Sequence, residues 1–597
     1  MSNPNNLIKI RHSTEHVLMQ AMVRLYGMDK FYMAMGPATD DGFYFDFEPL
    51  QDLKVSEEDF PKIEAEMQKV INENQPIIRK EVNLAEAKKI FSYNPYKTEW
   101  LDSITNRGEK IILYINGDNE LVDLCAGPHA KSTGEIKAFK LLSVAGAYWH
   151  GSEKNKMLTR IYGTAFESKE ELEKYLWKIE ETQRRDHRKL GKELDLFTFS
   201  ELVGSGFPLY TPKGSFLRRT VNDYVESTQA QQGYTQVWTP QVAKAKLFQI
   251  SGHYDKYKDS MFRVVSNYSD EEFFLKPMNC PQHTQIYASQ PRSYRDLPLR
   301  YTDFAMLYRD EKPGELNGLA RVRAFSQDDC HIFCREDQVD AEVDIALSMI
   351  KTIMDTFGLK YRYRLSTRDP EHQEKYIGDP KQWDKVEKWA VEIMKRNQID
   401  YFDGPGEAAF YAPKMDLMAT DALGREWQLS TVQIDYFMPE RFKLEYTDQE
   451  GKKTRPIMLH RAIIGSPERF LMILIEHYAG AFPVWLSPLQ AKIIPITDAQ
   501  HGYANQVLAK LKEQGIRVEI DDRSEKMQAK IRDAQMEKIP YMLIIGAKEV
   551  GTDSCVCSTS MISVRQRDGQ DLGALNVDSF LAKIKEQITT KSLNLIK

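Results

Sequence analysis

The sequence predicts a multidomain protein of α+β and α/β segments, with an antiparallel sheet in its middle and a doubly wound α/β domain at its C-terminus. Its 597 residues suffice for three or four domains of about 150 residues each. A highly charged stretch with apolar residues at helical intervals predicts one long linker helix at 167–196. In the last segment, strand and helix patterns alternate cleanly, which is typical of a doubly wound domain.

Composition excludes several classes of protein. Hydrophobic residues make up 42% and charged residues 28% of the chain, which fits neither a disordered nor a fibrous protein. The net charge is -6, so any RNA contact has to use local basic patches. Six cysteines are too few for a disulfide scaffold and favour a reducing compartment. With no signal peptide and no run of the roughly 18 apolar residues that a membrane span needs, we expect a cytoplasmic protein without membrane contact.

The N-terminal segment carries two separate groups of candidate metal ligands. In RHSTEH, His12 and His16 lie one helical turn apart on one face. In VDLCAGPHA, Asp123 precedes Cys125 and His129. If the fold joins the two groups they could form a metal quartet, although each group alone is more often structural.

The middle segment is organised around the stretch from Tyr308 to Cys334. Two strand-like runs joined by a glycine-containing turn carry arginines, among them Arg309 and Arg321. A guanidinium group can grip phosphate with two parallel hydrogen bonds, while Glu311 could accept from an amine and Phe325 could stack on a ring. An ordinary solvated hairpin is the alternative. Because the chain has no phosphate-loop motif, a nucleotide site here would have to be of the antiparallel-sheet kind.

Other patterns flank this stretch. An amphipathic pattern at 216–231 is followed by a strand-like run from Thr235 to Thr239 that ends at Pro240. Such a helix and strand can pack across a dimer axis or, equally well, within a core. Further along, His460 lies at the end of a strand-like run, and Arg469 stands at the start of an apolar helix.

Eight strings, in this order, resemble the threonyl-tRNA synthetase family of the bacterial type, a class II family, over essentially the whole chain. They are RHSTEH, VDLCAGPH, AGAYWHGSEKNKMLTRIYGTAF, FLKPMNCPQH, SYRDLPLR, YRDEKPGELNGLARVRAFSQDDCHIF, IMLHRAIIGSPERF and IPYMLIIGAKEV. The resemblance implies a chain that lacks the family's small N-terminal domain. It further implies an editing domain at 1–166, a linker helix at 167–196, a class II catalytic domain at 197–486 and an anticodon-binding domain at 487–597.

The resemblance also implies an activity. The protein would activate L-threonine with ATP and Mg²⁺, transfer it to tRNA(Thr), hydrolyse mischarged Ser-tRNA(Thr), and act as a homodimer. One Zn²⁺ per subunit would be held by Cys280, His331 and His460, which leaves positions open for substrate. Asp329 would bond the hydroxyl group of threonine, which valine lacks. Serine would pass this filter, so a second, hydrolytic site is expected.

Individual roles follow from the same resemblance. The expected catalytic residues are Arg309 on the α-phosphate, Glu311 on the adenine amino group, Phe325 on the base, Arg469 on the γ-phosphate side and His253 at the tRNA 2′-hydroxyl. The amino-acid and adenylate pocket would be completed by Met278, Arg321, Tyr411, Gln428, Thr431 and Gln433. Editing would use a positioned water, without a metal, among His12, His16, Lys97, Asp123, Cys125 and His129. The anticodon would be contacted by Lys526, Arg532, Glu549 and Arg565.

The chain departs from the family pattern at several positions. Phe45 stands where the editing pocket often has Tyr, and Ser524 stands where Asn is common in the last domain. The loop with Cys555 and Cys557 looks longer than usual. Two other functions are possible alternatives for such a chain. A silent paralogue that binds tRNA or its own messenger would be expected to lose an arginine or a zinc ligand, and all are present. A free metal hydrolase would describe the first segment alone.

Overall fold

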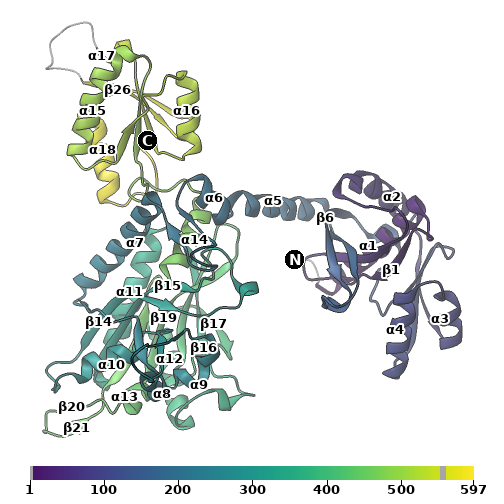
Figure 1. The fold of residues 1–597 in the computed structure, drawn as a ribbon, viewed down its shortest axis with the longest axis horizontal. Coiled ribbons are helices and arrows are strands. Elements are labelled where there is room, and N and C mark those ends of the chain that lie inside the picture. The colour runs from purple at the N-terminus through teal and green to yellow at the C-terminus, as the bar shows by residue number, and fades with distance from the viewer. Residues whose placement is uncertain (1–3, 551–559, 597) are drawn as a thin grey trace. The chain divides into compact units, whose positions relative to one another are not determined.

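The computed structural model describes residues 4–550 and 560–596 and separates into two compact units, Met1–Glu180 and Glu181–Lys597 (Figure 1). Helix α5 (Lys169–Arg185) runs across the boundary. The loop that carries Cys555 and Cys557 lies outside the described residues. Among the residues that are described, no helix combines the length and the apolarity that crossing a membrane requires.

The first unit is built on a four-stranded antiparallel sheet in the order β1-β2-β7-β6. Alternation along β2 directs Phe43, Phe45 and Phe47 to one face, where they form a core with α1 and α2. These elements are β1 (Phe31–Met35), β2 (Phe43–Pro49), β6 (Ala138–Tyr148), β7 (Met157–Phe166), α1 (Pro4–Tyr26) and α2 (Phe60–Asn72).

A second, smaller layer completes this unit. Its three antiparallel strands have the order β3-β4-β5 and share a small core with two short helices. The elements are β3 (Ile77–Val82), β4 (Ile111–Asn116), β5 (Leu121–Leu124), α3 (Leu84–Ile90) and α4 (Pro95–Asn106). Asn94 caps α4 by accepting hydrogen bonds from the N–H groups of Tyr96 and Lys97, so the cap places Lys97 in the first helical turn.

The second unit contains an eight-stranded sheet in the order β10-β14-β15-β22-β19-β18-β16-β17. All neighbours are antiparallel except the two outer pairs, which confirms the predicted antiparallel sheet. The strands are β10 (Thr235–Gln236), β14 (Leu299–Tyr308), β15 (Ala324–Cys334), β16 (Lys360–Thr367), β17 (Tyr401–Pro405), β18 (Lys414–Thr420), β19 (Glu426–Asp435) and β22 (Ile457–Ala462).

Helices cover one face of this sheet and form the largest core of the unit. Alternation along β15 sends Cys330 and Ile332 into that core, and it sends His331 and Phe333 to the opposite face. The covering helices are α7 (Pro212–Gln231), α11 (Val339–Thr356), α12 (Pro380–Arg396) and α14 (Pro467–His477). The remaining helices of this region are α8 (Ala245–Ser251), α9 (His253–Tyr257), α10 (Cys280–Ala288) and α13 (Phe437–Arg441). The remaining strands are β8 (Phe197–Thr198), β9 (Leu209–Tyr210), β11 (Val242–Lys244), β12 (Arg263–Val264), β13 (Phe273–Leu275), β20 (Tyr446–Thr447) and β21 (Lys453–Thr454).

The C-terminal segment forms a five-stranded sheet in the order β24-β23-β25-β26-β27. The first three strands are parallel and the last two are antiparallel. Strand β27 was not predicted, because Gly573 interrupts its pattern and the strand lies at an exposed edge. The elements are β23 (Ala491–Pro495), β24 (Val518–Ile520), β25 (Tyr541–Ile545), β26 (Met561–Gln566), β27 (Asp571–Asn576), α15 (His501–Glu513), α16 (Met527–Met536), α17 (Ala547–Val550) and α18 (Val577–Thr589).

The prediction of one continuous helix over 167–196 was wrong, because the helical part spans 169–193 and is interrupted at Asp186. Asp186 has non-helical backbone angles, φ −51° and ψ 119°, and divides the segment into α5 and α6 (His187–Glu193). Its carboxylate accepts a hydrogen bond from the N–H of Arg188 at 2.8 Å, which caps the new helix. The break makes His187 the first residue of α6.

Candidate functional site

A cavity of about 380 Å³ opens on the large sheet where β15 and β19 meet the start of α14 and the loop between β14 and β15. Most of the residues predicted to bind nucleotide line it. The lining consists of Arg309, Glu311, Leu319, Ala320, Arg321, Val322, Phe325, Gln327, Gln428, Leu429, Thr431, Ala462, Gly465, Ser466 and Arg469.

Two arginines give this cavity an uncompensated positive charge. Within the described part of the chain, neither Arg309 nor Arg469 forms an ion pair with a carboxylate; Arg309 donates to the sulfur of Met278 at 3.4 Å, and Arg469 donates to the Ala320 carbonyl at 3.3 Å. Burial lowers the pKa of both groups, and the charges of Arg309 and Arg321 lower the pKa of Arg469 further. A cavity with two such cations is suited to a polyanion.

Glu311, the acidic residue of the cavity, already accepts hydrogen bonds on one of its two carboxylate oxygens. Both hydrogen bonds from Arg321 to Glu311, at 3.0 and 2.7 Å, end on Oε2. Next to this pair, the Arg309 guanidinium lies 5.1 Å from the centre of the Phe325 ring. A flat ring system could therefore stack near Phe325 while Oε1 of Glu311 accepts from an amino group.

The three predicted metal ligands come together from separate elements. Cys280 begins α10, and His331 on β15 lies directly opposite His460 on β22. One potential ligand atom from each side chain lies within 4.8 Å of the others, and Nε2 of His331 is 3.1 Å from Nδ1 of His460. All three side chains are buried. One thiol and two imidazoles are a donor set typical of zinc with open positions.

The second ring nitrogen of each histidine also has a partner. His331 Nδ1 lies 2.8 Å from Nδ1 of His283, and His460 Nε2 lies 2.9 Å from Oδ2 of Asp435. Such partners fix the orientation of metal-bound imidazoles. Neither residue was among the predicted site residues, although a Cys-x-x-His spacing and the strand alternation from Gln433 to Asp435 could have indicated them.

The electrostatics of the cluster also suit a cation. Burial, with the charges of His283 and His460 as further causes, lowers the pKa of His331 well below its usual range and keeps the imidazole neutral. Burial raises the pKa of the Cys280 thiol, and the nearby carboxylates of Asp329 and Asp435 raise it further. A divalent cation would favour the thiolate, so these residues fit zinc.

Several predicted substrate residues surround the cluster. Asp329 Oδ1 lies 3.7 Å from His331 Nε2, and burial raises the pKa of Asp329 to about 8. The Tyr411 ring is 4.9 Å from that of His460. Gln433 lies opposite His460 on β19 and is buried. Three of the predicted substrate residues thus lie beside the cluster, while Arg321, Gln428 and Thr431 line the neighbouring cavity.

His253 lies against the same cluster. Its Nε2 is 3.7 Å from Cys280 Sγ, and its Nδ1 is 2.8 Å from Ser251 Oγ. The side chain is fully buried, and burial together with the charges of His460 and Arg309 lowers the pKa of His253 to about 3. The imidazole is neutral and is a weak base.

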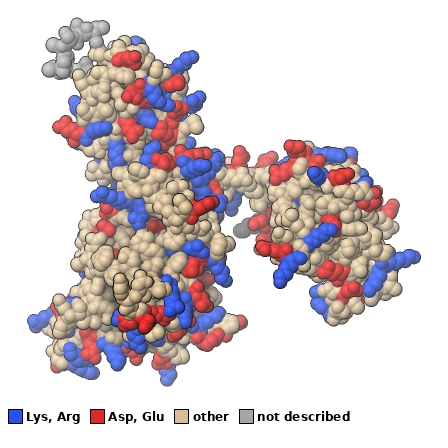
Figure 2. Space-filling view, viewed as in Figure 1, with Lys and Arg blue, Asp and Glu red and all other residues tan. Residues whose placement is uncertain are grey.

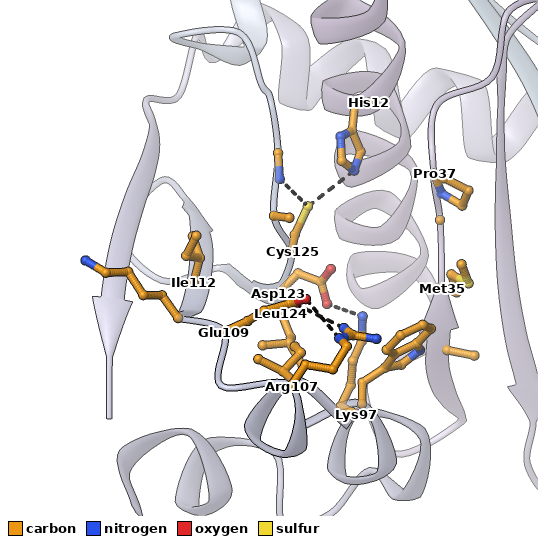
Figure 3. Close-up of a pocket in the computed structure, with 17 residues that line it drawn as sticks. His12, Met35, Pro37, Lys97, Arg107, Glu109, Ile112, Asp123, Leu124 and Cys125 are labelled. Carbon is orange, nitrogen blue, oxygen red and sulfur yellow. Dashed lines mark hydrogen bonds and ion pairs between the residues drawn. The ribbon is translucent and has the colours of Figure 1, made fainter. Parts of the chain in front are cut away.

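In the first unit the two histidine-rich groups do meet. Cys125 Sγ lies 3.2 Å from both His12 Nε2 and His129 Nε2, and His16 completes the group. Figure 3 shows the contact between His12 and Cys125. The Lys97 ammonium forms a buried ion pair with Asp123 at 2.6 Å. These side chains adjoin a cavity of about 320 Å³, whose lining includes His12, Lys97, Asp123 and Cys125.

The groups of this second site are uncharged apart from the ion pair. Burial, followed by the charge of Asp123, raises the pKa of Cys125 to about 12. Burial also lowers the pKa values of His12, His16 and His129. A neutral thiol is a poor nucleophile, so the chemistry available is the positioning of a neutral molecule such as water. Phe45 does not line this cavity, because it is fully buried in the core beside Phe47.

The predicted anticodon residues lie on two parts of the C-terminal domain. Glu549 accepts from the N–H of Gly546 and from Ser563 on β26, the strand that carries Arg565. Lys526 and Arg532 are exposed at α16. No hydrogen bond or ion pair of the described chain joins these two groups. Figure 2 shows acidic and basic side chains interspersed over the visible face, so charge does not mark an RNA surface on that face.

Three family models match parts of the chain. The tRNA synthetase class II core domain (G, H, P, S and T) matches residues 262–478. An anticodon binding domain matches residues 490–587. The threonyl and alanyl tRNA synthetase second additional domain matches residues 112–162.

Curated relatives are similar over nearly the full length. The threonine–tRNA ligase of Rubrobacter xylanophilus is 46% identical over 592 residues, which cover 99% of this chain and 90% of the relative. That of Geobacillus kaustophilus is 45% identical and covers 100% of this chain and 89% of the relative. Among solved structures, the RNA binding domain of threonyl-tRNA synthetase from Cryptosporidium parvum matches with a TM-score of 0.63 and 36% identity, covering 67% of this chain and 98% of that chain.

Proposed function

The chain belongs to the threonine–tRNA ligase family, and on that premise we propose that it joins L-threonine to tRNA(Thr) with ATP. The observation that carries the proposal is that one sheet bears both the cationic cavity of Arg309 and Arg469 and the cluster of Cys280, His331 and His460. The cationic cavity suits a nucleoside triphosphate, and the buried cluster suits a zinc-assisted choice of amino acid.

In the first step, the carboxylate of threonine attacks the α-phosphorus of ATP and pyrophosphate leaves. Arg309 would stabilise the negative charge that develops on the α-phosphate, and Arg469 would hold the γ-phosphate side of ATP with Mg²⁺. Phe325 would stack on the adenine, and Oε1 of Glu311 would accept from its amino group. The Glu311–Arg321 pair would keep that carboxylate in place.

The choice of amino acid rests on the buried cluster. Zn²⁺ held by Cys280, His331 and His460 would supply a Lewis-acid site for the amino and hydroxyl groups of threonine. Asp329 would accept a hydrogen bond from that hydroxyl group. Valine has the same shape but no hydroxyl, and a site that leaves its buried polar groups unpaired rejects such an analogue strongly. Around the amino acid and the adenylate, the pocket would be closed by Met278, Tyr411, Gln428, Thr431 and Gln433.

In the second step, the terminal 2′-hydroxyl of the tRNA would attack the carbonyl carbon of threonyl-adenylate, and AMP would leave with its phosphate as the acceptor of the hydroxyl proton. His253 would orient this hydroxyl. Because a pKa of about 3 makes His253 a weak base, its contribution would be a hydrogen bond and not the removal of a proton at neutral pH.

The first unit would remove serine from mischarged tRNA. A water placed among His12, His16, Cys125 and His129 would attack the ester carbonyl and release serine and free tRNA, with Lys97 and Asp123 as the charged pair of the site. Replacing His12 and His129 with Ala should leave threonine charging intact while Ser-tRNA(Thr) accumulates. If charging fell as much as hydrolysis, the division into two sites would be wrong.

We also propose a cytoplasmic homodimer that contacts the anticodon through Lys526, Arg532, Glu549 and Arg565. Strand β10 is an edge strand of the large sheet, and Trp238 beside it is 73% exposed. An open edge next to a large apolar side chain is suited to pairing with a second copy. Sedimentation equilibrium should give twice the mass of the chain, and Trp238→Glu should lower it.

The deciding experiment for the whole proposal is amino-acid-dependent exchange of pyrophosphate into ATP. We expect exchange with threonine, and zinc at one ion per chain by metal analysis. No exchange, or faster exchange with proline or serine, would rule the proposal out. Full activity in a zinc-free preparation would rule out the proposed selection of threonine.

A further inference from the structure

We infer that His187, at the start of α6, is a positioning residue that holds the nucleotide loop, residues 309–323 between β14 and β15, in the shape that receives ATP. His187 is not part of the cavity lining. The inference rests on the proposed function, because it takes ATP as the occupant of that cavity.

The imidazole of His187 bridges the nucleotide loop and α14. Its Nε2 accepts a hydrogen bond from the N–H of Leu319 at 3.1 Å. The ring hydrogen is therefore on Nδ1, which donates to Oε1 of Glu476 at 2.7 Å. The side chain is almost fully buried. Although Asp186, His187 and Glu476 resemble a metal cluster, both ring nitrogens are already engaged.

The other side of this bridge is fixed as well. Glu476 lies near the end of α14 and also accepts from Arg425, so the carboxylate cannot turn away from His187. At the start of the same helix, Arg469 donates to the carbonyl of Ala320. Two successive residues of the nucleotide loop, Leu319 and Ala320, are thus tied to the two ends of α14.

The loop depends on this anchor for two reasons. Leu319 is 1% exposed, so without an acceptor its N–H would be buried and unpaired, which disfavours the present conformation. Gly318 has φ +48°, and a Cβ there would lie 2.1 Å from Nε2 of His187. Because the next four residues, 319–322, line the cavity, a shift of the turn would move Arg321 and Val322 relative to the bound nucleotide.

Two substitutions test the two hydrogen bonds of the His187 imidazole separately. The amide of Asn reaches about as far as Nδ1, and that of Gln about as far as Nε2. His187→Asn should keep the bond to Glu476 and lose the acceptor for Leu319, and His187→Gln should restore that acceptor. In pyrophosphate exchange we expect His187→Asn to raise KM for ATP about 10-fold, with KM for threonine unchanged. His187→Gln should stay within about 2-fold of wild type.

A second variant leaves the imidazole in place. Gly318→Ala should displace the turn from His187 and raise KM for ATP to a similar extent. In the double variant with His187→Asn, KM for ATP should be little higher than in Gly318→Ala alone. Equal KM values for the Asn and Gln variants, or a parallel rise in KM for threonine, would overturn the inference. If His187→Asn does not fold, the test rests on Gly318→Ala, and an unchanged KM for ATP in that variant would overturn the inference. Absence of exchange in the wild type would instead refute the proposed function.

Discussion

Replacing Asp435 with Asn tests whether the buried cluster is a metal site, because the two carboxylate oxygens have separate tasks. Oδ1 accepts from the N–H groups of Phe437 and Met438 at 2.7 and 3.0 Å, which starts α13, while Oδ2 contacts Nε2 of His460 at 2.9 Å. Asn retains the first acceptor and replaces the second with an N–H donor. With a metal on Nδ1 of His460, its Nε2 carries hydrogen, so two donors would face each other.

The expected size of the effect follows from this single lost contact. Loss of such an outer partner typically weakens metal binding about 10- to 100-fold, or about 1.4–2.8 kcal/mol. That range agrees with about 1.5–3 kcal/mol for a hydrogen bond to a charged group. We would measure the zinc dissociation constant of the metal-free wild type and Asp435→Asn by competition with a chromophoric chelator at fixed pH.

A control variant separates metal binding from folding. Asp435→Ala removes both tasks of the carboxylate, so it should weaken zinc binding and also lower the thermal midpoint of the metal-free protein. Asp435→Asn should weaken zinc binding while the thermal midpoint stays close to that of wild type. Zinc affinity of Asp435→Asn within 2-fold of wild type would contradict the proposed role of Asp435 at His460.

Four further predictions concern the other parts of the molecule. Arg469→Ala should lower kcat of threonine-dependent exchange about 10²- to 10³-fold with an unchanged circular dichroism spectrum; a smaller loss would remove Arg469 from the transition state. His129→Ala should abolish hydrolysis of Ser-tRNA(Thr) in a deacylation assay, and retained hydrolysis would exclude His129 from the site. Burial raises the pKa of Asp329 to about 8, so its ionisation destabilises the metal-free protein increasingly as pH rises from about 4 to about 8. In calorimetry without zinc, the thermal midpoint of Asp329→Asn minus that of wild type should therefore increase as the pH rises over that range. A difference that does not change with pH would argue against this ionisation. Phe470 is fully buried, so Phe470→Ala should cost about 3–5 kcal/mol in urea unfolding, and a loss below about 1 kcal/mol would mean that the core is loosely packed there.

Local patterns could predict much of the fold. The helical spacing of His12 and His16 placed both on one face of α1, and the structure brings them to Cys125 and His129. The alternation of strand and helix after residue 487 predicted most of the C-terminal domain. The break at Asp186 could not be predicted in this way. A highly charged segment is equally compatible with one continuous helix and with two helices, the second of which is capped by Asp186.

The metal cluster could not be found from spacing alone. His331 and His460 are separated by 129 residues and meet only because β15 and β22 pair in one register. Such a register depends on which strands become neighbours, and that is decided by packing across the whole sheet. The resemblance to a family implied the three ligands, whereas the contacts of His283 with His331 and of Asp435 with His460 are set by the fold.

The alternation of a single strand explains why the proposed nucleotide cavity and the proposed metal cluster lie beside each other. On β15, Phe325, Gln327, Asp329 and His331 share one face, and they pass from the ring beside Arg309 to the metal ligands. The residues between them serve the fold instead; Asp328, for example, accepts from the backbone N–H groups of residues 463–465. A slip of one residue against β22 would turn all four functional side chains into the core at once. The buried polar anchors on the opposite face therefore hold the register on which both binding sites depend.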